Sequence, residues 1–347
     1  MRIGGSIRDA VAPAVALLLT NAGAIDRFLS RARRAVLGET KGIVVPVFHA
    51  VLPPGAALPD LDPAYTITTD QLAEVHHYFI SSGFTPIGLP QLLQGLDPGR
   101  NYVMFTFDDG YANNLAAVTM LERAGVPVML SANMTMVRSG ESFWWDVLYR
   151  ELRKSGAKQD AIERARARLI PMDPAAVRQE LAQRFGDEAL RPRGDVDRPL
   201  TIAELQDLAR RPTVSFANHT SDHRLLRGRD RASVTASLAE TQREIKELSG
   251  TEPVAVTYPY GVYDDVTLQC CRDLRFEVGF TGRFGKAMLP DELRGTARMR
   301  LPRCVIYGDR PIAAQCESTH LDWRPSWTVR RWLQRLQSNL YPGPAPP

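Results

Sequence analysis

The sequence is poor in cysteine and contains no long hydrophobic run. Of its four cysteines, Cys270 and Cys271 are adjacent, while Cys304 and Cys316 stand alone. This pattern fits neither paired CxxC metal motifs nor a small disulfide scaffold, so it favours a reducing compartment. Basic residues exceed acidic ones by only four charges, too small a surplus to indicate nucleic-acid binding. With 44% hydrophobic and 24% charged residues among 347, the composition excludes wholesale disorder.

The apolar run near the N-terminus, Val11–Leu19, is too short to cross a bilayer as a helix. Arg2 and Arg8 precede it and Ala22-Gly23-Ala24 follows, so residues 1–24 could be a signal peptide of an exported protein. Alternatively, the apolar face continues to Leu37 among arginines. That pattern favours one amphipathic helix over residues 1–41, in a cytoplasmic protein that touches a membrane peripherally.

β-rich apolar runs alternate with helical patterns through most of the chain. This alternation indicates an α/β fold with a parallel sheet, either open or closed as a barrel. The expected strands are Ile43–Phe48, Tyr102–Phe107, Val126–Ala132, Thr213–Ala217, Val254–Tyr258, Phe276–Thr281 and Leu301–Tyr307. The expected helices include 113–124, 230–248, 264–274 and one that begins at the capping box Thr201-x-x-Glu204.

Two segments differ from this pattern. Residues 141–200 are richer in charge than the whole chain and poor in β-branched runs, which predicts a helical insertion. It is either a surface elaboration or a lid that grips substrate. Residues 321–347 contain Trp323, Trp327 and Trp332 among arginines and end in a proline-rich tail. They predict a C-terminal helix, packed on the domain or lying at a membrane interface, and then a disordered tail.

Two adjacent acids, Asp108 and Asp109, end the expected strand at Thr106-Phe107-Asp108-Asp109-Gly110. Adjacent buried carboxylates are costly unless something uses their charge. A metal ion would let one acid bind while the other stays a free base. The alternative is a pair of caps that opens the next helix.

Two histidines, His219 and His223, follow the expected strand 213–217 directly. If this segment forms a helical turn, both imidazoles lie on one face and reach one ion. The alternative is a pair of surface histidines, although the chain has only six histidines. A third segment, Tyr258-Pro259-Tyr260-Gly261, predicts a rigid loop whose Tyr260 lines a groove; Pro-Tyr-Gly also makes ordinary turns. Two histidines, one aspartate and a further carboxylate are what metal-assisted hydrolysis needs.

These three segments resemble the first three motifs of the polysaccharide deacetylases, also called NodB-homology or carbohydrate esterase family 4 enzymes, and the resemblance covers about residues 42–310. It implies a distorted (β/α) barrel, here over 42–320, which removes N-acetyl or O-acetyl groups from a sugar or polysaccharide. The implied cofactor is Zn²⁺ or another divalent metal, held by Asp109, His219 and His223. The implied catalytic base is Asp108, and the backbone N–H of Tyr111 would bind the oxyanion.

Two positions depart from the family pattern. Thr257 stands where the family's third motif has a base-orienting arginine, and Arg303 is the candidate replacement. The family's late Leu-x-x-His acid is not evident, since no strand precedes His320. The segment Val45–Ala50 instead resembles the first strand of the circularly permuted poly-N-acetylglucosamine deacetylases, whose acid histidine ends that strand. His49 is therefore the expected acid; the alternative is a hydrogen-bonded core histidine.

The substrate implied by the resemblance is an N-acetylated sugar, a polysaccharide or a lipid-linked glycan. The cluster Phe143-Trp144-Trp145-Asp146 also resembles that subset, so Trp145 or Trp144 is expected to wall the sugar site, together with Pro259, Tyr260 and Gly261. A core role for the tryptophans is the alternative. Two other functions stay open: hydrolysis of a non-sugar amide on the same scaffold, and glycan binding by a degenerate site.

Overall fold

The structure, a computed structural model, describes residues 26, 28–33, 35, 36, 38–56 and 61–319. One compact unit is Lys41–Cys316, and the other comprises the terminal segments Met1–Thr40 and Glu317–Pro347. Residues 26, 28–33, 35 and 36 are helical. The possible signal peptide, His320 and the expected C-terminal helix and tail lie outside the described residues. Within the described part of the chain, no helix combines the length and the apolar character needed to span a membrane.

Parallel strands form the centre of the Lys41–Cys316 unit. A five-stranded sheet has the order β13-β2-β7-β8-β9, and all of its neighbouring strands are parallel. The bounds are β2 Pro46–Phe48, β7 Phe105–Asp109, β8 Val128–Ala132, β9 Val214–Phe216 and β13 Cys304–Val305. Parallel neighbours place their carboxyl ends at the same edge, which is where α/β proteins carry their chemistry.

Further pairings continue from the two ends of this sheet. β10 (Ala255–Thr257) and β11 (Val278–Phe280) pair in parallel. A bridge between Asn218 and Val256 joins the end of β9 to β10, and a bridge between Phe280 and Leu301 leads from β11 towards β13. These pairings and bridges link the strands in the order β13-β2-β7-β8-β9-β10-β11, and Leu301 lies three residues before β13. This confirms the predicted α/β class and a distorted, barrel-like arrangement.

Shorter strands extend the structure on either side. The other strands are β1 Gly42–Val44, β3 Ala50–Leu52, β4 Thr66–Thr68, β5 Thr85–Pro86, β6 Tyr102–Val103 and β12 Ala287–Met288. A second sheet has the order β12-β1-β6-β5, and β3 pairs with β4. Two of the strands predicted from sequence are thus interrupted, at Val45 and at Met104.

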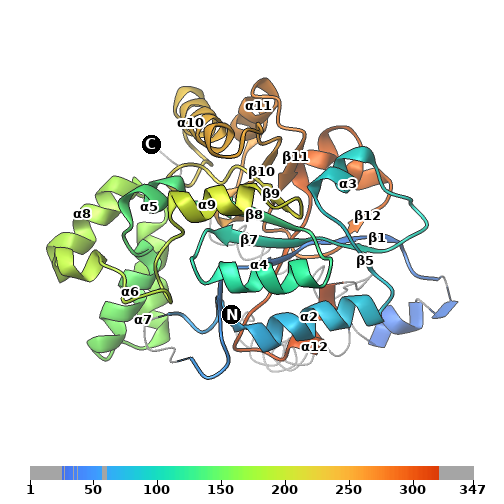
Figure 1. The fold of residues 1–347 in the computed structure, drawn as a ribbon, viewed down its shortest axis with the longest axis horizontal. Coiled ribbons are helices and arrows are strands. Elements are labelled where there is room, and N and C mark those ends of the chain that lie inside the picture. Colours follow the sequence, from blue (N-terminus) through green and yellow to red (C-terminus); the bar gives the residue numbers. More distant parts are fainter. Residues whose placement is uncertain (1–25, 27, 34, 37, 57–60, 320–347) are drawn as a thin grey trace, which may run out of the picture. The chain divides into compact units, whose positions relative to one another are not determined.

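Helices cover these strands, with α2 and α4 on one side and α10 and α11 on the other in Figure 1. Their bounds are α2 Thr69–Ser81, α3 Leu89–Gln94, α4 Asn114–Arg123, α10 Arg231–Ser249 and α11 Asp265–Asp273. The three helices predicted at 113–124, 230–248 and 264–274 are confirmed to within a residue at each end. Their ends follow capping chemistry: the Asp230 side chain caps α10, and Gly250 ends it with φ 73°.

The predicted insertion is helical and lies between β8 and β9. Its range, 141–200, contains α6 Trp144–Lys154, α7 Gln159–Leu169, α8 Pro174–Phe185 and the 3₁₀ turn η1 Asp187–Leu190, while α5 Met134–Ser139 precedes it and α9 Ile202–Ala209 follows it. Helices α6, α7 and α8 gather at one side of the strands (Figure 1) and share a core that includes Val147, Ile162 and Leu181. The capping box of α9 forms as predicted, because Thr201 and Glu204 exchange both hydrogen bonds.

A fully buried ion pair fixes the insertion internally. Arg150 Nη1 donates to Asp197 Oδ2 over 2.8 Å, and both side chains have no exposed surface. Arg150 also donates to the carbonyl of Ala189, and Asp197 accepts from Ser142 Oγ at 3.0 Å. One guanidinium thus connects the first helix of the insertion to its last turns.

We expect Arg150→Ala to lower the free energy of unfolding by about 3–5 kcal/mol, because it leaves the Asp197 carboxylate buried without its partner. The measurement is urea unfolding followed by circular dichroism. Arg178→Ala is the matched control, since Arg178 pairs with Glu141 at the surface and is 50% exposed; it should cost less than about 1 kcal/mol. Equal losses in the two variants would contradict the anchoring role of Arg150.

Candidate active site

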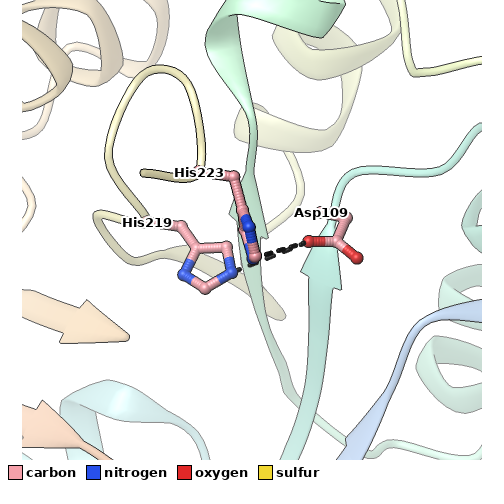
Figure 2. A group of neighbouring side chains, drawn as sticks. All are labelled: Asp109, His219 and His223. Atoms are coloured by element: carbon pink, nitrogen blue, oxygen red, sulfur yellow. Dashed lines mark ion pairs between the residues drawn. The ribbon is translucent and has the colours of Figure 1, made fainter. Parts of the chain in front are cut away.

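Three potential metal ligands converge beyond the carboxyl ends of β7 and β9 (Figure 2). Asp109 is the last residue of β7, whereas His219 and His223 lie in the loop after β9. The Nε2 atoms of His219 and His223 lie 3.7 and 3.5 Å from Asp109 Oδ1. All three side chains are buried, and one donor atom from each lies within 4.8 Å of the others.

The donor set suits a divalent cation. Donors about 2.1 Å from a tetrahedral ion lie roughly 3.4 Å from one another, close to the separations found here. Asp109 Oδ1 is also buried without a hydrogen-bond partner among the described residues. A buried carboxylate oxygen facing two imidazole nitrogens calls for a positive charge between them. Nitrogen and oxygen donors of this kind suit zinc and its neighbours among the divalent metals.

Thr257 orients the first of the two imidazoles. His219 Nδ1 lies 2.7 Å from the Thr257 carbonyl and 2.8 Å from its hydroxyl. A proton on Nδ1 satisfies the carbonyl and leaves the Nε2 lone pair directed at Asp109. Thr257 thus supports a potential metal ligand at the position where the family pattern has arginine.

The two imidazoles differ in their affinity for protons. Burial would lower the pKa of His219, but the Asp108 and Asp109 carboxylates raise it above its usual value. Burial and the facing His219 ring lower the pKa of His223 to about 4. His223 is therefore neutral at pH 7, as a metal ligand must be, and a cation beside the carboxylates would displace the proton from His219.

The loop that carries the histidines is not helical, which corrects the prediction of a helical turn. Residues 219–223 contain no helix, and Thr220 and His223 have φ values of 59° and 55°. Asp109 (φ 69°) and Tyr260 (φ 58°) share this unusual backbone. Left-handed conformations are costly for such residues and persist where surrounding structure enforces them. The strained turn, rather than a helical face, brings the two rings to a centroid distance of 4.7 Å.

Asp108 lies beside the potential metal ligands and pairs with Arg303. Arg303 Nη1 lies 2.9 Å from Asp108 Oδ1 and 2.8 Å from Oδ2, and both side chains are almost fully buried. Burial would raise the pKa of Asp108, but the Arg303 guanidinium and the His219 ring hold it well below its usual value. The carboxylate is therefore ionised at neutral pH. The structure thus brings Arg303 to Asp108, the contact expected of a replacement for the family's arginine.

A cavity of about 390 Å³ opens over this cluster, a volume within the range of small-molecule sites. Its lining includes most of the residues expected at the site, namely His49, Asp108, Asp109, Tyr111, Trp144, Trp145, His219, His223, Tyr260, Gly261 and Arg303. Pro259 is buried and does not line the cavity. It opens the 3₁₀ turn η2 (Pro259–Gly261), so it shapes the loop. Only glycine fits at 261, because a Cβ there would lie 2.2 Å from the backbone nitrogen of Gly282.

A hydrogen-bond network that the sequence analysis did not anticipate ties Tyr111 to the insertion. The Tyr111 hydroxyl donates to Asp146 Oδ2 at 2.7 Å and accepts from Trp145 Nε1 at 2.8 Å. Trp145 in turn lies against the His223 ring, with centroids 4.9 Å apart. The insertion therefore supplies one wall of the cavity, as a lid would, and is not only a surface elaboration.

Other lining residues were also not predicted: Asp62, Tyr65, Arg166, Ile170 and Tyr307. Asp62 and Tyr65 lie between β3 and β4, and Tyr307 follows β13. Arg166 and Ile170 come from the end of α7. Only Tyr307 had a sequence signal, as the last residue of a predicted strand; the others lie in segments without a recognised motif.

Comparisons with known proteins agree with this fold. Residues 173–279 match the family model described as polysaccharide deacetylase, a range that includes the histidine and Tyr-Pro-Tyr-Gly motifs but not Asp108 and Asp109. A search of curated proteins gives no match.

Several solved structures of deacetylases resemble this chain, and the similarity extends over most of both chains. The Streptococcus pyogenes deacetylase PplD, solved in complex with acetate, has a TM-score of 0.56 at 15% identity over 81% of this chain and 99% of its own. IcaB from Ammonifex degensii has a TM-score of 0.54 at 17% identity, covering 80% and 98%. The deacetylase domain of BpsB from Bordetella bronchiseptica has a TM-score of 0.50 at 19% identity, covering 76% and 95%. The family-model match and the shared fold confirm the resemblance to the polysaccharide deacetylases, and they support a deacetylase.

Proposed function

We propose that this protein is a metal-dependent deacetylase that removes N-acetyl groups from a hexosamine-containing glycan. The observation that carries the proposal is the convergence of Asp109, His219 and His223 beside the Asp108–Arg303 pair on the wall of one cavity. A set of metal ligands next to an ionised carboxylate that is not one of them separates metal binding from proton transfer. Metal-assisted hydrolysis of an amide needs that separation.

The proposal gives the metal ligands one role and the base, its partner and the oxyanion donor each another. Asp109, His219 and His223 hold a Zn²⁺ or another divalent cation. When bound, the cation polarises the acetamide carbonyl and lowers the pKa of a water molecule. Asp108 takes the proton of the attacking water, while Arg303 keeps that carboxylate ionised and fixed in place. The backbone N–H of Tyr111 donates to the oxygen that becomes negative in the tetrahedral intermediate.

His49 completes the reaction as the proton donor to the leaving nitrogen. It follows β2 directly, lines the cavity, and its Nδ1 is buried without a hydrogen-bond partner among the described residues. Its carbonyl accepts from Asn114 Nδ2 at 2.7 Å, which fixes the backbone of this residue. An amine is a poor leaving group until it is protonated, so amide hydrolysis needs such an acid. The products are acetate and a free amino sugar.

The proposal is tested by incubating the metal-loaded protein with β-linked N-acetylglucosamine oligomers and with an N-acetylated amine that carries no sugar. We expect acetate release from the oligomers, and release that stops when a chelator removes the metal. Hydrolysis of the sugar-free amide alone would favour an amidase on the same scaffold. Binding of oligomers with no acetate release from any substrate would favour a glycan-binding protein.

For His49→Ala, we expect turnover of the amide to fall about 10²–10⁴-fold, because the leaving amine loses its proton donor. Turnover of 4-nitrophenyl acetate should fall much less, since a nitrophenolate leaves without a proton. The exposed His77 on α2, outside the cavity, provides the control variant His77→Ala. Equal losses on amide and ester would assign His49 a structural or binding role.

A further inference from the structure

The cavity has a second wall, to which the proposed chemistry gives no role. This distal wall consists of Asp62, Tyr65, Arg166, Ile170 and Tyr307. It begins at the proposed acid, because the Tyr65 ring meets the His49 ring edge-on with centroids 5.4 Å apart. The Tyr307 ring follows at 5.7 Å from Tyr65. The rings of His49, Tyr65 and Tyr307 thus form a row of contacts among the residues that line the cavity.

A shielded ion pair stabilises this row. Arg166 Nη2 donates to Asp62 Oδ2 at 2.8 Å, and the two side chains are only 12% and 5% exposed. The Arg166 guanidinium also lies over the Tyr65 ring, 5.5 Å from its centroid. Tyr65 nevertheless keeps 38% of its surface accessible, so its ring remains available to a ligand. Aromatic surface beside fixed hydrogen-bonding groups is suited to a sugar, which has apolar C–H faces and a rim of hydroxyls.

The direction of the reaction assigns the occupant of this wall. His49 protonates the nitrogen that leaves, and that nitrogen is bonded to the sugar ring. The ring must therefore lie one bond beyond the nitrogen, on the His49 side of the cavity. The acetyl group then lies by the metal ligands, where the Trp145 and Tyr260 rings line the cavity and both contact the His223 ring, with centroids 4.9 and 4.6 Å from it.

The charge of the distal wall restricts the class of sugar. The Arg166 guanidinium is shared by two carboxylates, Asp62 at 2.8 Å and Glu163 at 2.9 Å. Its positive charge is therefore offset. The Arg310 guanidinium, 4.1 Å from the centroid of the Tyr307 ring, is paired with Asp309 at 3.6 Å, so no cation among the described residues of this wall is left unpaired for a phosphate or uronate. The wall suits an uncharged ring.

We propose that the distal wall is the subsite for the hexosamine ring that carries the reacting acetamide, and that it selects uncharged rings. This inference rests on the proposed function, since it takes the position of the leaving nitrogen from it. It gives the insertion a direct part in substrate binding, because Arg166 and Ile170 belong to the end of α7. It also places the acetyl group, rather than the sugar, against Trp145.

The test compares Tyr65→Ala with Tyr65→Phe on the β-linked N-acetylglucosamine tetramer and on 4-nitrophenyl acetate. We expect Tyr65→Ala to raise KM for the tetramer about tenfold more than KM for the ester, the scale of losing one buried aromatic contact. Tyr65→Phe should restore most of the binding because it keeps the ring. Arg166→Ala should also raise KM for the tetramer. The matched control is Arg168→Ala, two residues along α7, where the side chain is 55% exposed and pairs with Glu180. This variant should leave KM unchanged for both the tetramer and the ester.

Equal effects of Tyr65→Ala on tetramer and ester would overturn the subsite, and so would an unchanged KM for the tetramer. N-acetylglucosamine 1-phosphate that binds more tightly than N-acetylglucosamine would overturn the selection for uncharged rings. If wild-type protein releases no acetate from the tetramer, the proposed function fails, and the subsite is then tested by calorimetric titration with the same tetramer. Binding that Tyr65→Ala weakens supports the subsite in that case, and no binding overturns it.

Discussion

Asp108→Asn should bind metal as tightly as the wild type and lose turnover by about 10²–10⁴-fold, the usual contribution of a general base. The substitution removes a proton acceptor and keeps the shape of the side chain. Its amide oxygen can still accept a hydrogen bond from Arg303, which lies 2.9 Å from Asp108 Oδ1. Because Asp109 and the two histidines are untouched, the metal ligands stay in place. Metal content is measured after dialysis, and turnover is measured as acetate release.

The control for this experiment is Asp70→Asn, at an exposed position in the first turn of α2. It removes the same charge far from the cavity and should leave turnover unchanged. If Asp108→Asn kept a rate near that of the wild type, proton transfer would belong to another residue. If it lost metal and activity together, Asp108 would be a ligand, and the separation between binding and catalysis would be wrong.

The second large effect is expected for His219→Ala, which should abolish stoichiometric metal binding and with it all activity. Only two donors remain, Asp109 and His223. The contacts of His219 Nδ1 with the carbonyl and hydroxyl of Thr257, at 2.7 and 2.8 Å, are lost together with the ligand that they orient. Supporting contacts of this kind alone account for roughly 10–100-fold in metal affinity, so losing the ligand itself should cost more. Metal content by elemental analysis and far-ultraviolet circular dichroism report binding and fold separately.

Thr257→Val is a useful companion, because it removes the hydroxyl and keeps the carbonyl that accepts from His219. We expect weaker metal binding in that variant rather than none. A His219→Ala protein that retained one tightly bound metal per chain would show that the metal site lies elsewhere. If circular dichroism showed that His219→Ala was unfolded, the same measurements would be made on His219→Gln, which keeps a polar side chain of similar size.

Much of the barrel could be predicted because its strands are short apolar runs bounded by turn residues. The strands predicted at 43–48 and 102–107 were located to within two residues at each end, yet both are broken, at Val45 and Met104. Such breaks depend on how two sheets meet, which the hydrophobic pattern does not record. Helix α2 was not predicted at all, although Thr68 and Gln71 form its capping box. Gly83 (φ 78°) follows its end as Gly125 follows that of α4, so the sequence carried signals at both ends of this helix that were not used.

The residues of the candidate site also differ in how well the sequence predicts them. Residues in compact motifs, such as Asp108, Asp109, His219 and His223, could be found because their chemistry is local in sequence. The helical turn assigned to the histidines was wrong, because left-handed residues at 220 and 223 leave no periodic pattern. Arg303 was named only as a candidate, because 195 positions separate it from Asp108 in the sequence and the fold alone brings the two together. Arg166 was hidden because a charged helical residue predicts a solvated surface until the fold shows what faces it.

The insertion also affects how the cavity could change in evolution. β8 and β9 keep their parallel register, Val128 opposite Val214 and Leu130 opposite Phe216, although five helices separate them in the chain. The entropy of closing a loop grows only with the logarithm of its length, so doubling this segment would cost the barrel roughly 0.6 kcal/mol. The free energy of pairing β8 with β9 therefore depends only weakly on the length of the segment between them. A lineage could lengthen, shorten or replace it, and so change which ligands the cavity accepts, while Asp108 and Asp109 on β7 and the two histidines in the loop after β9 remain as they are.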